Sequence, residues 1–405
     1  MGLDNIGGGH VLRIVIGTTV LVLLIAGIVD AKTLTVNAGG GANFTRIQDA
    51  INNSNNGDSI LVYSGTYFEN VNVNKQLILK GMDTGEGKPA VDASGSGDAV
   101  TLSAGKSTLD GFTVTNGAII GIVVTSDYNI LSNNSAMNNT EDGIVLTNAS
   151  NNTLDNNSAS SNTIFGIALL DGSNRNILSG NNALNNGNAG IFLRDSSSNT
   201  LNNNNANLNN VQGIDLLASI KNILINNTVS NSNYGIYLES SSDNNILGAN
   251  TVNINRINGI FLTGSSNNTI YNNNFNNTNN FGVSGSNTWN TTKTSGTNII
   301  HGPNIGGNYW ANPNGTGFSQ TCPDANGDGI CDSSYMLDIN NIDYLPLKKD
   351  ILSYYRNLGN IPNVVETTDL LKAADDWSNN VAPQGFASPI TTQQLLALAD
   401  EWARS

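Results

Sequence analysis

An aspartate-rich stretch near residue 330 carries the side chains best suited to hold a metal ion. Its candidate ligands are hard oxygen donors at alternate positions: Asp324, Asn326, Asp328, the backbone carbonyl of Ile330, and Asp332. Gly329 permits the tight loop that this spacing requires, and calcium prefers oxygen ligands at such intervals. Position 12, where a full EF-hand loop has a bidentate glutamate, is Tyr335. The pattern therefore predicts a short structural calcium loop, with a plain acidic turn as the alternative.

Two cysteines, Cys322 and Cys331, flank this loop. In an exported chain, two cysteines so close in sequence are expected to form a disulfide. The bridge would hold the loop ligands in place. Zinc is a weaker alternative because His301 is the only histidine nearby in the sequence.

Four carboxylates farther upstream are weaker candidates for acid–base catalysis: Asp171, Asp195, Asp215 and Glu239. Strand and coil spacings place Asp215 and Glu239 about 8 Å apart, within the range that an inverting glycosidase uses. Asp171 and Asp195 occupy equivalent repeat positions, so stacking places them about 5 Å apart. At that separation they would share a cation or perturb each other's pKa.

Aromatic residues stand beside these carboxylates in the same repeat. Phe192, Tyr237 and Phe261 are expected to point outward, and Arg194 belongs to the neighbouring outward column. Exposed rings can stack on sugar rings, so these four residues are predicted to form a binding patch. The alternative is structural, because aromatic residues are good strand formers. In that case Arg194 and Glu239 form an ordinary charged face, and the C-terminal segment covers the stripe.

The element that must position these residues is a repeat of about 22–24 residues. Seven asparagines occupy the same point of its frame: Asn134, Asn157, Asn181, Asn204, Asn227, Asn250 and Asn273. A large aliphatic residue stands three positions before each asparagine, and Ala, Val or Phe stands two positions after it. A register this tight is typical of a solenoid, in which each unit stacks on the previous one. The interleaved aliphatic residues argue against the alternative of low-complexity, disordered sequence.

A second recurring phrase, Gly-Ile-x-Leu, has the alternation of a β-strand. Each repeat offers about three short strands separated by Gly, Asn and Ser, which tolerate left-handed backbone at corners. The sequence therefore predicts an all-β fold. It is a right-handed parallel β-helix, a three-sided solenoid with about 22–24 residues per coil, followed by a small C-terminal helical segment. Inward Asn amides would bond to the corner backbone and to the amides above and below.

The N-terminal region divides into two expected segments. Residues 1–31 are predicted to be a cleaved signal peptide or a retained anchor, because residues 14–29 are apolar or small and are followed by a cleavage-like site. Residues 32–81 form an N-terminal cap and the first coils. In that cap Ile47, Ala50 and Ile51 share one helical face that would plug the open end of the solenoid.

Three segments follow. Residues 82–290 carry the repeats, and residues 291–350 form a closing segment that contains the Asp-rich loop and the disulfide. Residues 351–405 contain a duplicated phrase, 367–377 and 391–402, in which each copy begins with Thr and ends with Trp. Two amphipathic helices are expected there. They would form either a small interaction module or a lid on the solenoid.

Composition indicates an exported protein without a nucleic-acid partner. The 405 residues carry 17 Lys+Arg against 31 Asp+Glu, for a net charge of -14, so few basic groups are available to neutralise phosphates. Sequons such as those at Asn43, Asn52, Asn133, Asn148, Asn226 and Asn314 would accept N-linked glycan in a host that glycosylates exported proteins. Many such matches arise by chance in so Asn-rich a chain.

The repeats and the closing phrases together resemble a known superfamily. The Gly-Ile-x-Leu and Asn-Asn-x-Leu-x-x-Asn units are similar to the right-handed β-helix repeats of NosD-like and pectin-lyase-like proteins of the archaeal cell-surface type. GNYW at 307–310 and IDYLPL at 342–347 look like the segment that closes such proteins, and the Asp-rich loop resembles the calcium loops of thrombospondin-type or dockerin-like modules. The resemblance covers about residues 33–350. It implies the fold more strongly than any activity, because the superfamily contains lyases, hydrolases, epimerases and proteins without known chemistry.

NosD itself is associated with copper-site maturation, but the residues argue against copper here. Copper sites use clusters of His, Met or Cys, and after removal of residues 1–31 the chain keeps His301 and two cysteines.

Three function classes remain for the sequence. The favoured one is an exported cell-surface protein with a structural, adhesive or surface-interaction role and no catalysis. The others are a non-catalytic glycan-binding module and a polysaccharide lyase, hydrolase or epimerase. Expected partners are cell-envelope components or polysaccharide, and the chain would contact a membrane only through an uncleaved N-terminal segment.

Overall fold

The computed structural model describes residues 31–349, 351–356, 358, 365–383 and 389–404. The predicted signal peptide or anchor, residues 1–31, lies outside the described residues apart from Ala31. Within the described ranges, every helix is too short or too polar to cross a membrane.

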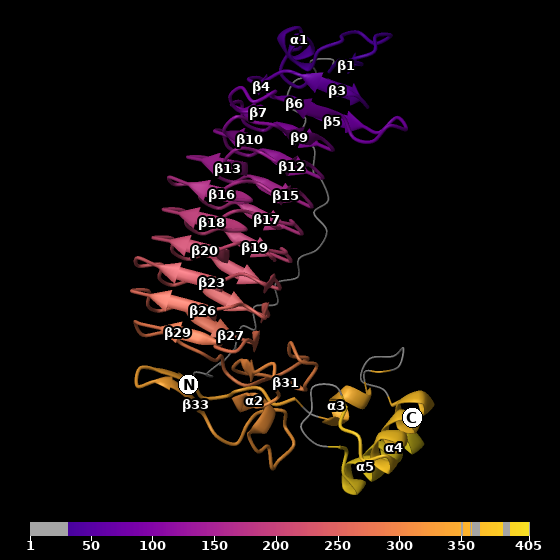
Figure 1. Ribbon diagram of the computed structural model, residues 1–405, viewed down its shortest axis with the longest axis vertical. Coiled ribbons are helices and arrows are strands. Elements are labelled where there is room, and N and C mark those ends of the chain that lie inside the picture. Colours follow the sequence, from indigo (N-terminus) through magenta and orange to yellow (C-terminus); the bar gives the residue numbers. More distant parts are fainter. Residues whose placement is uncertain (1–30, 350, 357, 359–364, 384–388, 405) are drawn as a thin grey trace, which may run out of the picture. The chain divides into compact units, whose positions relative to one another are not determined.

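Parallel strands stack coil upon coil to form a right-handed solenoid, which confirms the predicted fold class (Figure 1). Three strands per coil build three sides. We call them sheet A, with 11 strands, sheet B, with runs of five and four strands, and sheet C, with 10 strands. Isolated bridges at Asn182 and Asn205 connect the two runs of sheet B. Strand residues pair in parallel with their counterparts in the next coil, as Leu131 does with Leu154 on sheet A.

The bounds of the strands follow the chain through the three sheets. Sheet A contains β1 (Thr33–Val36), β2 (Ser59–Tyr63), β5 (Ile78–Met82), β8 (Thr108–Asp110), β11 (Ile130–Ser132), β14 (Thr153–Asp155), β17 (Ile177–Ser179), β19 (Thr200–Asn202), β21 (Ile223–Ile225), β24 (Ile246–Gly248) and β27 (Thr269–Tyr271). Sheet B contains β3 (Thr66–Phe68), β6 (Ala90–Asp92), β9 (Thr113–Thr115), β12 (Ser135–Met137), β15 (Ser158–Ser160), β22 (Thr228–Ser230), β25 (Thr251–Asn253), β28 (Asn274–Asn276) and β32 (Tyr309–Ala311). Sheet C contains β4 (Val71–Val73), β7 (Val100–Leu102), β10 (Ile120–Val124), β13 (Asp142–Thr147), β16 (Ile167–Leu170), β18 (Ile191–Arg194), β20 (Gln212–Leu217), β23 (Tyr234–Glu239), β26 (Asn258–Thr263) and β29 (Phe281–Val283).

One apolar core runs inside the coils from Val36 to Trp310. At its N-terminal end lies α1 (Ile47–Asn52), and its buried residues are Ile47, Ala50 and Ile51, as predicted for a plug. The buried Glu69 accepts hydrogen bonds from the backbone N–H groups of Ile47 and Gln48 at 2.8 and 3.0 Å. A carboxylate from the neighbouring coil therefore satisfies the start of this helix, where the backbone N–H groups lack partners within the helix.

The predicted asparagine ladder is confirmed at the corner between sheets A and B. Each amide nitrogen donates to the amide oxygen of the next coil, for example from Asn204 to Asn227 at 3.0 Å, and also to a corner carbonyl, in this case that of Leu178 at 2.9 Å. The residue before each ladder asparagine has a left-handed backbone, from Asn133 (φ 55) to Asn272 (φ 55). The Asn-Asn pair thus divides two tasks, because the first residue turns the chain and the second fills the corner.

The other two corners carry ladders that the sequence analysis missed. The corner before sheet A stacks Asn129, Asn152, Asn176, Asn199, Asn222, Asn245, Asn268 and Asn287. The corner between sheets B and C stacks Asn139, Asn162, Asn186 and Asn209, then Asn255 and Asn277 after a gap at Ser232. Most of these residues lie five positions before or after the predicted ladder, so a five-residue offset was the available signal.

The closing segment ends two of these ladders with side chains of one strand. It contains β30 (Thr294–Ser295), β31 (Asn304–Ile305), α2 (Phe318–Thr321), β33 (Tyr335–Asp338) and β34 (Asn341–Asp343). Asn341 accepts a hydrogen bond from the backbone of Asn287, and Asp343 accepts one from the backbone of Asn308, which extends the Asn273 ladder. Burial raises the pKa of Asp343 to about 7, although N–H donors from Asn308, the Trp310 side chain and Leu345 act to lower it.

The C-terminal segment contains α3 (Ile351–Arg356), α4 (Thr367–Ser378) and α5 (Thr392–Arg404), so the expected helical pair has a short companion. The duplicated phrase gives α4 and α5 reciprocal contacts. The indole N–H of Trp377 donates to Thr392, and that of Trp402 donates to Thr367, both at 3.2 Å. The two copies of the phrase therefore make matching contacts, which relate α4 and α5 by an approximate twofold symmetry.

Candidate functional site: the outer face of sheet C

The outward side chains of sheet C form a surface that we call the sheet C face. Alternation along β20 produces it, because Ile214 and Leu216 are fully buried in the core and the intervening Asp215 must point to the other side. Parallel register then sets Asp215 between Phe192 of β18 and Tyr237 of β23. Phe261 of β26 continues the same column. The structure thus places the three aromatic residues of the predicted patch and Asp215 in one column.

Asp215 is a buried polar residue of this face. It is 4% exposed, and its Oδ1 atom is buried without a hydrogen-bond partner among the described residues. Burial, with a smaller contribution from the charge of Glu239, raises the pKa of Asp215 to about 8. A carboxyl group in such surroundings keeps its proton at neutral pH. It can therefore donate a hydrogen bond as well as accept one.

Aromatic rings cover both sides of this carboxyl group. Phe192 is 7% exposed and stacks on Phe165 with ring centroids 4.4 Å apart. On the other side Tyr237 lies 5.2 Å from Phe261, and Tyr234 lies 5.4 Å from both rings. Burial, followed by the charge of Glu239, raises the pKa of Tyr237 to about 12, so its hydroxyl stays protonated. The three-ring cluster is half-exposed, whereas Phe192 belongs to a small outer apolar cluster.

Sequence reasoning missed the first outward column of this face, which lies just before the Gly of each Gly-Ile-x-Leu phrase. It contains Tyr234 and Gln212, whose Oε1 atom is also buried without a partner. It also contains Asp142, and burial raises the pKa of that carboxyl to about 6 although it accepts a bond from the Phe165 backbone at 2.8 Å. The constant position before glycine was the signal that could have identified these residues.

Glu239 and Arg194 belong to the third outward column, as predicted. Register pairs Glu239 with Leu217, which makes Glu239 a diagonal neighbour of Asp215. The separation of about 8 Å between Asp215 and Glu239 stays a prediction. Arg194 forms an ion pair with Asp171 at 2.8 Å, and both side chains are largely exposed to solvent. The cation beside Asp171 is thus the side chain of Arg194, which belongs to the next coil.

The second predicted carboxylate pair lies at the end of sheet C. The backbone N–H of Asp171 donates to Arg194, and that of Gly172 donates to Asp195, so the two aspartates occupy neighbouring coils at one corner. Both have left-handed backbone, with φ of 54 for Asp171 and 50 for Asp195. Their role in catalysis stays a prediction.

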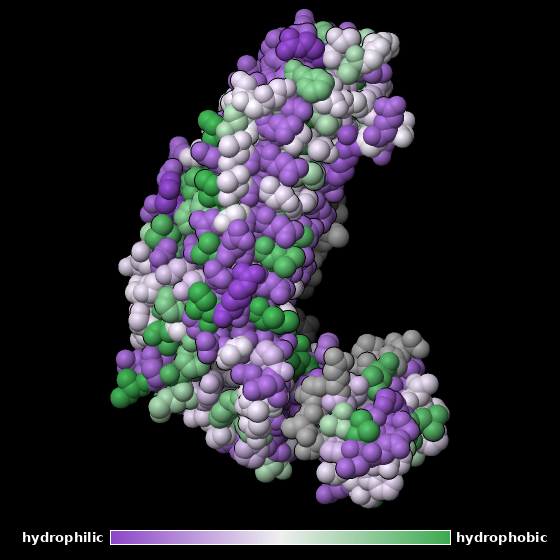
Figure 2. All heavy atoms as spheres, viewed as in Figure 1, coloured by the Kyte–Doolittle hydropathy of each residue, from purple (hydrophilic) through white to green (hydrophobic). Residues whose placement is uncertain are grey.

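The sheet C face is not an uninterrupted apolar surface. On the side of the molecule shown in Figure 2, hydrophobic and hydrophilic residues are mixed.

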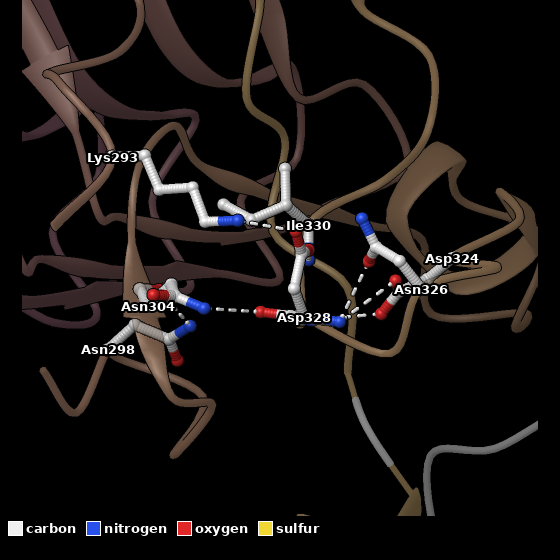
Figure 3. A network of polar contacts seen from close by, with 8 residues as sticks. Lys293, Asn298, Asn304, Asp324, Asn326, Asp328 and Ile330 are labelled. Carbon is white, nitrogen blue, oxygen red and sulfur yellow. Dashed lines mark hydrogen bonds and ion pairs between the residues drawn. The ribbon is translucent and has the colours of Figure 1, made fainter. Parts of the chain in front are cut away.

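The Asp-rich loop lies apart from the sheet C face, in the closing segment (Figure 3). Its side-chain oxygens bind backbone N–H groups. Asp324 accepts from Asp328 and Gly329 at 3.2 and 2.9 Å, Asn326 accepts from Asp328 at 3.0 Å, and Asp332 accepts from Ala325 at 3.0 Å. The predicted disulfide is confirmed, since Cys322 and Cys331 are bonded with Cα atoms 5.7 Å apart.

A lysine provides the positive charge at this loop. Lys293 forms an ion pair with Asp328, whose other carboxylate oxygen accepts from the Ile330 backbone at 2.9 Å. Burial acts to raise the pKa of Asp328, but hydrogen bonds from Lys293 and from the Ile330 backbone, together with the charge of Lys293, outweigh it and leave that pKa below its ordinary value. Burial raises the pKa of Asp324. Within the described part of the chain, no three or more His, Cys, Asp or Glu side chains are grouped to hold a metal, so calcium stays a proposal.

Comparison of the sequence with protein families gives a clear result. The profile described as "Periplasmic copper-binding protein (NosD)" matches residues 51–217 and 169–315, which together cover more than half of the chain. The chain belongs to the NosD family. The resemblance to archaeal cell-surface proteins in particular stays a prediction. No relative was found among curated proteins.

Several solved structures are similar in fold to this NosD-family chain. Pectate lyase Pel9A has 15% identity and a TM-score of 0.45, with 64% of this chain and 78% of that chain covered. The enzymatically active domain of bacteriophage CBA120 tailspike protein 2 has 15% identity and a TM-score of 0.49, with 64% and 44% covered. The A-module of mannuronan C-5 epimerase AlgE6 from Azotobacter vinelandii has 14% identity and a TM-score of 0.43, with 60% and 89% covered.

The copper in the family description does not fit the described residues. His301 is the histidine that they include, and both cysteines are consumed by the disulfide. Met82, Met137 and Met336 lie on β5, β12 and β33, in three different sheets. Soft-ligand clusters of the kind that copper requires are therefore missing from the described part of the chain.

Proposed function

We propose that this NosD-family protein is an exported, non-catalytic surface-interaction protein that binds a glycan on its sheet C face. The family description places its members in the periplasm, which supports a location outside the cytoplasm. The acidic composition suits solubility there. A rigid solenoid presents the face at fixed spacing to polysaccharide or to cell-envelope components.

The observation that carries this proposal is the half-exposed cluster of Tyr234, Tyr237 and Phe261 beside Asp215. The Oδ1 atom of Asp215 is enclosed, so a sugar hydroxyl would meet the polar groups of Tyr237 and Glu239 rather than that oxygen. The adjacent rings of Tyr237 and Phe261 supply flat apolar surfaces for the C–H faces of a sugar. Polar and apolar recognition thus lie side by side.

The proposal is tested by glycan-array binding of the full chain and of Tyr237→Ala. Loss of stacking is expected to weaken binding about tenfold. Tyr271→Ala is the matched control, because Tyr271 points outward from sheet A on a different side of the same coils. Equal loss in both variants, or no glycan bound by the unmodified chain, would remove the proposal.

One observation favours catalysis as a second candidate function. Asp215 keeps its proton to about pH 8, and the carboxylate of Glu239 is close enough to influence that pKa. A protonated acid and a nearby carboxylate are the two groups that glycoside cleavage requires. Release of products from acidic polysaccharides, lost in Asp215→Asn and kept in Asp171→Asn, would support this candidate. Binding without product release would support the first.

We further propose that calcium stabilises the closing segment at the Asp-rich loop. The loop offers carboxylate and amide oxygens from Asp324, Asn326, Asp328 and Asp332 within one disulfide-bridged turn. Bound calcium would have to displace the ammonium group of Lys293 from Asp328. This requirement makes Lys293 a direct probe of the site.

A further inference from the structure

The helical pair of α4 and α5 exposes large apolar side chains at matching positions. Leu371 is 65% exposed and Leu396 is 64% exposed, and Trp377 and Trp402 are exposed as well. The four residues are equivalent in pairs within the duplicated phrase, since each leucine lies six positions before its tryptophan. We call the surface that they form the twin-helix face.

The approximate twofold symmetry places the two leucines on the same side of the helical pair. The start of α4 meets the end of α5, because Trp402 donates to Thr367, and the equivalent contact joins the other two ends. The helices therefore run antiparallel. An axis that exchanges two antiparallel helices is perpendicular to the plane of the pair, so Leu371 and Leu396 share a face. Leu371 lies one turn after Thr367, beside the ring of Trp402, and the other half repeats this arrangement.

The third helix, α3, packs on the opposite side of the pair. Tyr355 donates to Asp376 at 3.0 Å, and Arg356 forms an ion pair with Glu401 at 2.6 Å. Asp376 and Glu401 are equivalent residues that lie five positions after the exposed leucines, about 140° farther around each helix. One face of the pair is thus covered by its own chain, and the twin-helix face is uncovered among the described residues. An exposed apolar surface of this kind marks an interaction site.

Four charged side chains flank the twin-helix face, and they are balanced in sign. Asp375 and Asp400 lie one turn after the two leucines, and the basic residues are Lys372 and Arg404. Arg404 forms an ion pair with Asp400, and Lys372 forms one with Asp376. An anionic lipid surface or an acidic polymer would require an excess of basic groups here. A second copy of the same face presents acids and bases in equal number, which allows opposite charges to meet across the contact.

The shape of the face also suits a second copy. Two helical pairs docked face to face, about a twofold axis in the plane of the face, form a four-helix bundle in which neighbouring helices are antiparallel. The internal symmetry then makes the two halves of the contact alike. We propose that the twin-helix face binds the same face of a second copy of this chain.

The size of the face sets the expected strength of this dimer. With 12 residues in α4 and 13 in α5, the face is about 20 Å long and about 20 Å wide. Its area of about 400 Å² is half of the roughly 800 Å² that each partner buries in a standard interface. Small interfaces are weak, so the dimer is expected to form at tens to hundreds of micromolar.

Sedimentation equilibrium of the full chain, from about 10 μM to about 500 μM, tests the proposal. The unmodified chain is expected to shift from monomer to dimer across this range. Leu371→Gln and Leu396→Gln should each weaken the dimer about tenfold and to a similar extent, because the two residues are equivalent and glutamine keeps the helix propensity. The matched control is Ile130→Thr combined with Ile177→Thr, which removes two exposed aliphatic side chains from sheet A instead. Its dimer should equal that of the unmodified chain.

Three outcomes would overturn the proposal. The first is an unmodified chain that stays monomeric at the highest concentration, and the second is equal weakening in the sheet A control. The third is a lower melting temperature of Leu371→Gln at concentrations where the chain is monomeric, which would assign the face to a lid on the chain's own solenoid. Tyr237→Ala should leave the dimer unchanged, so this proposal and glycan binding can fail independently.

Discussion

The corners of the solenoid and the sheet C face both bury polar side chains, but they satisfy them differently. At the corner between sheets A and B, each amide bonds to the coils on both sides, as Asn204 does with Asn181 and Asn227. On the sheet C face, Asp215 and Gln212 each keep a buried oxygen without a partner. Fully paired polar networks specify a fold, and unpaired groups cost stability. The structural role of the repeat therefore lies at its corners, and the glycan site that we propose lies where the repeat departs from its own pattern.

Removal of a corner amide should have the largest effect on stability. Asn204→Ala deletes bonds to Leu178 and Asn227 and leaves two donors of Asn181 unsatisfied. We expect a loss of about 4 kcal/mol in the free energy of unfolding, measured by chemical denaturation. Asn205→Ala is the matched control, since the neighbouring Asn205 points outward and its Oδ1 is unpaired. Similar losses in both variants would contradict the contrast between corner and face.

The buried carboxyl should make stability depend on pH. Unfolding lowers the pKa of Asp215 from about 8 to its ordinary value of 3.8, so only the folded state holds this proton between those values. The stabilisation that this proton gives to the folded state is fully present below about pH 4 and disappears as the pH rises to about 8. Unmodified protein should lose stability relative to Asp215→Asn across that window, by up to about 1.4 kcal/mol per pH unit. Parallel stability curves for the two proteins would refute the burial of an unpaired acid.

Calcium should have an intermediate effect on stability. The side-chain oxygens of the Asp-rich loop already accept hydrogen bonds, but calcium could replace the ammonium group of Lys293. Millimolar calcium is expected to raise the melting temperature by a few degrees, corresponding to about 1–2 kcal/mol. Asp328→Ala should remove the shift. Lys293→Met, which removes the competing ammonium group, should lower the calcium concentration needed for it. An unchanged melting temperature in all three proteins would eliminate the calcium proposal.

Repair of the one interrupted corner should have the smallest effect. Ser232 occupies a ladder position between Asn209 and Asn255, and its buried hydroxyl has no hydrogen-bond partner. Ser232→Asn is expected to complete the ladder and stabilise the protein by about 1 kcal/mol, measured as a rise in melting temperature. A destabilised variant would show that the corner between sheets B and C is too narrow for the amide.

Part of the candidate site was predictable because a strand has a period of two. The outward column of Phe192, Asp215, Tyr237 and Phe261 follows from alternation and register alone. The burial of Asp215 did not follow, since it depends on rings contributed by neighbouring coils. Side chains from the flanking columns, such as Tyr234 and Phe165, close around the central column. Tyr234 and Phe165 come just before the glycine of the Gly-Ile-x-Leu phrase, where the alternation of inward and outward residues is interrupted.

The sequence by itself determined the solenoid, its coil length and the amide ladder of one corner, because stacking forces equivalent residues to recur at a constant interval. It also indicated the disulfide, since nine residues separate the two cysteines. Only the tertiary structure decided which polar atoms find partners. Pairing depends on distances between side chains that are far apart in sequence, as when Asp343 ends the ladder at Asn308, 35 residues away. The enclosed Oδ1 atom of Asp215, which has no hydrogen-bond partner among the described residues, is a property of that packing.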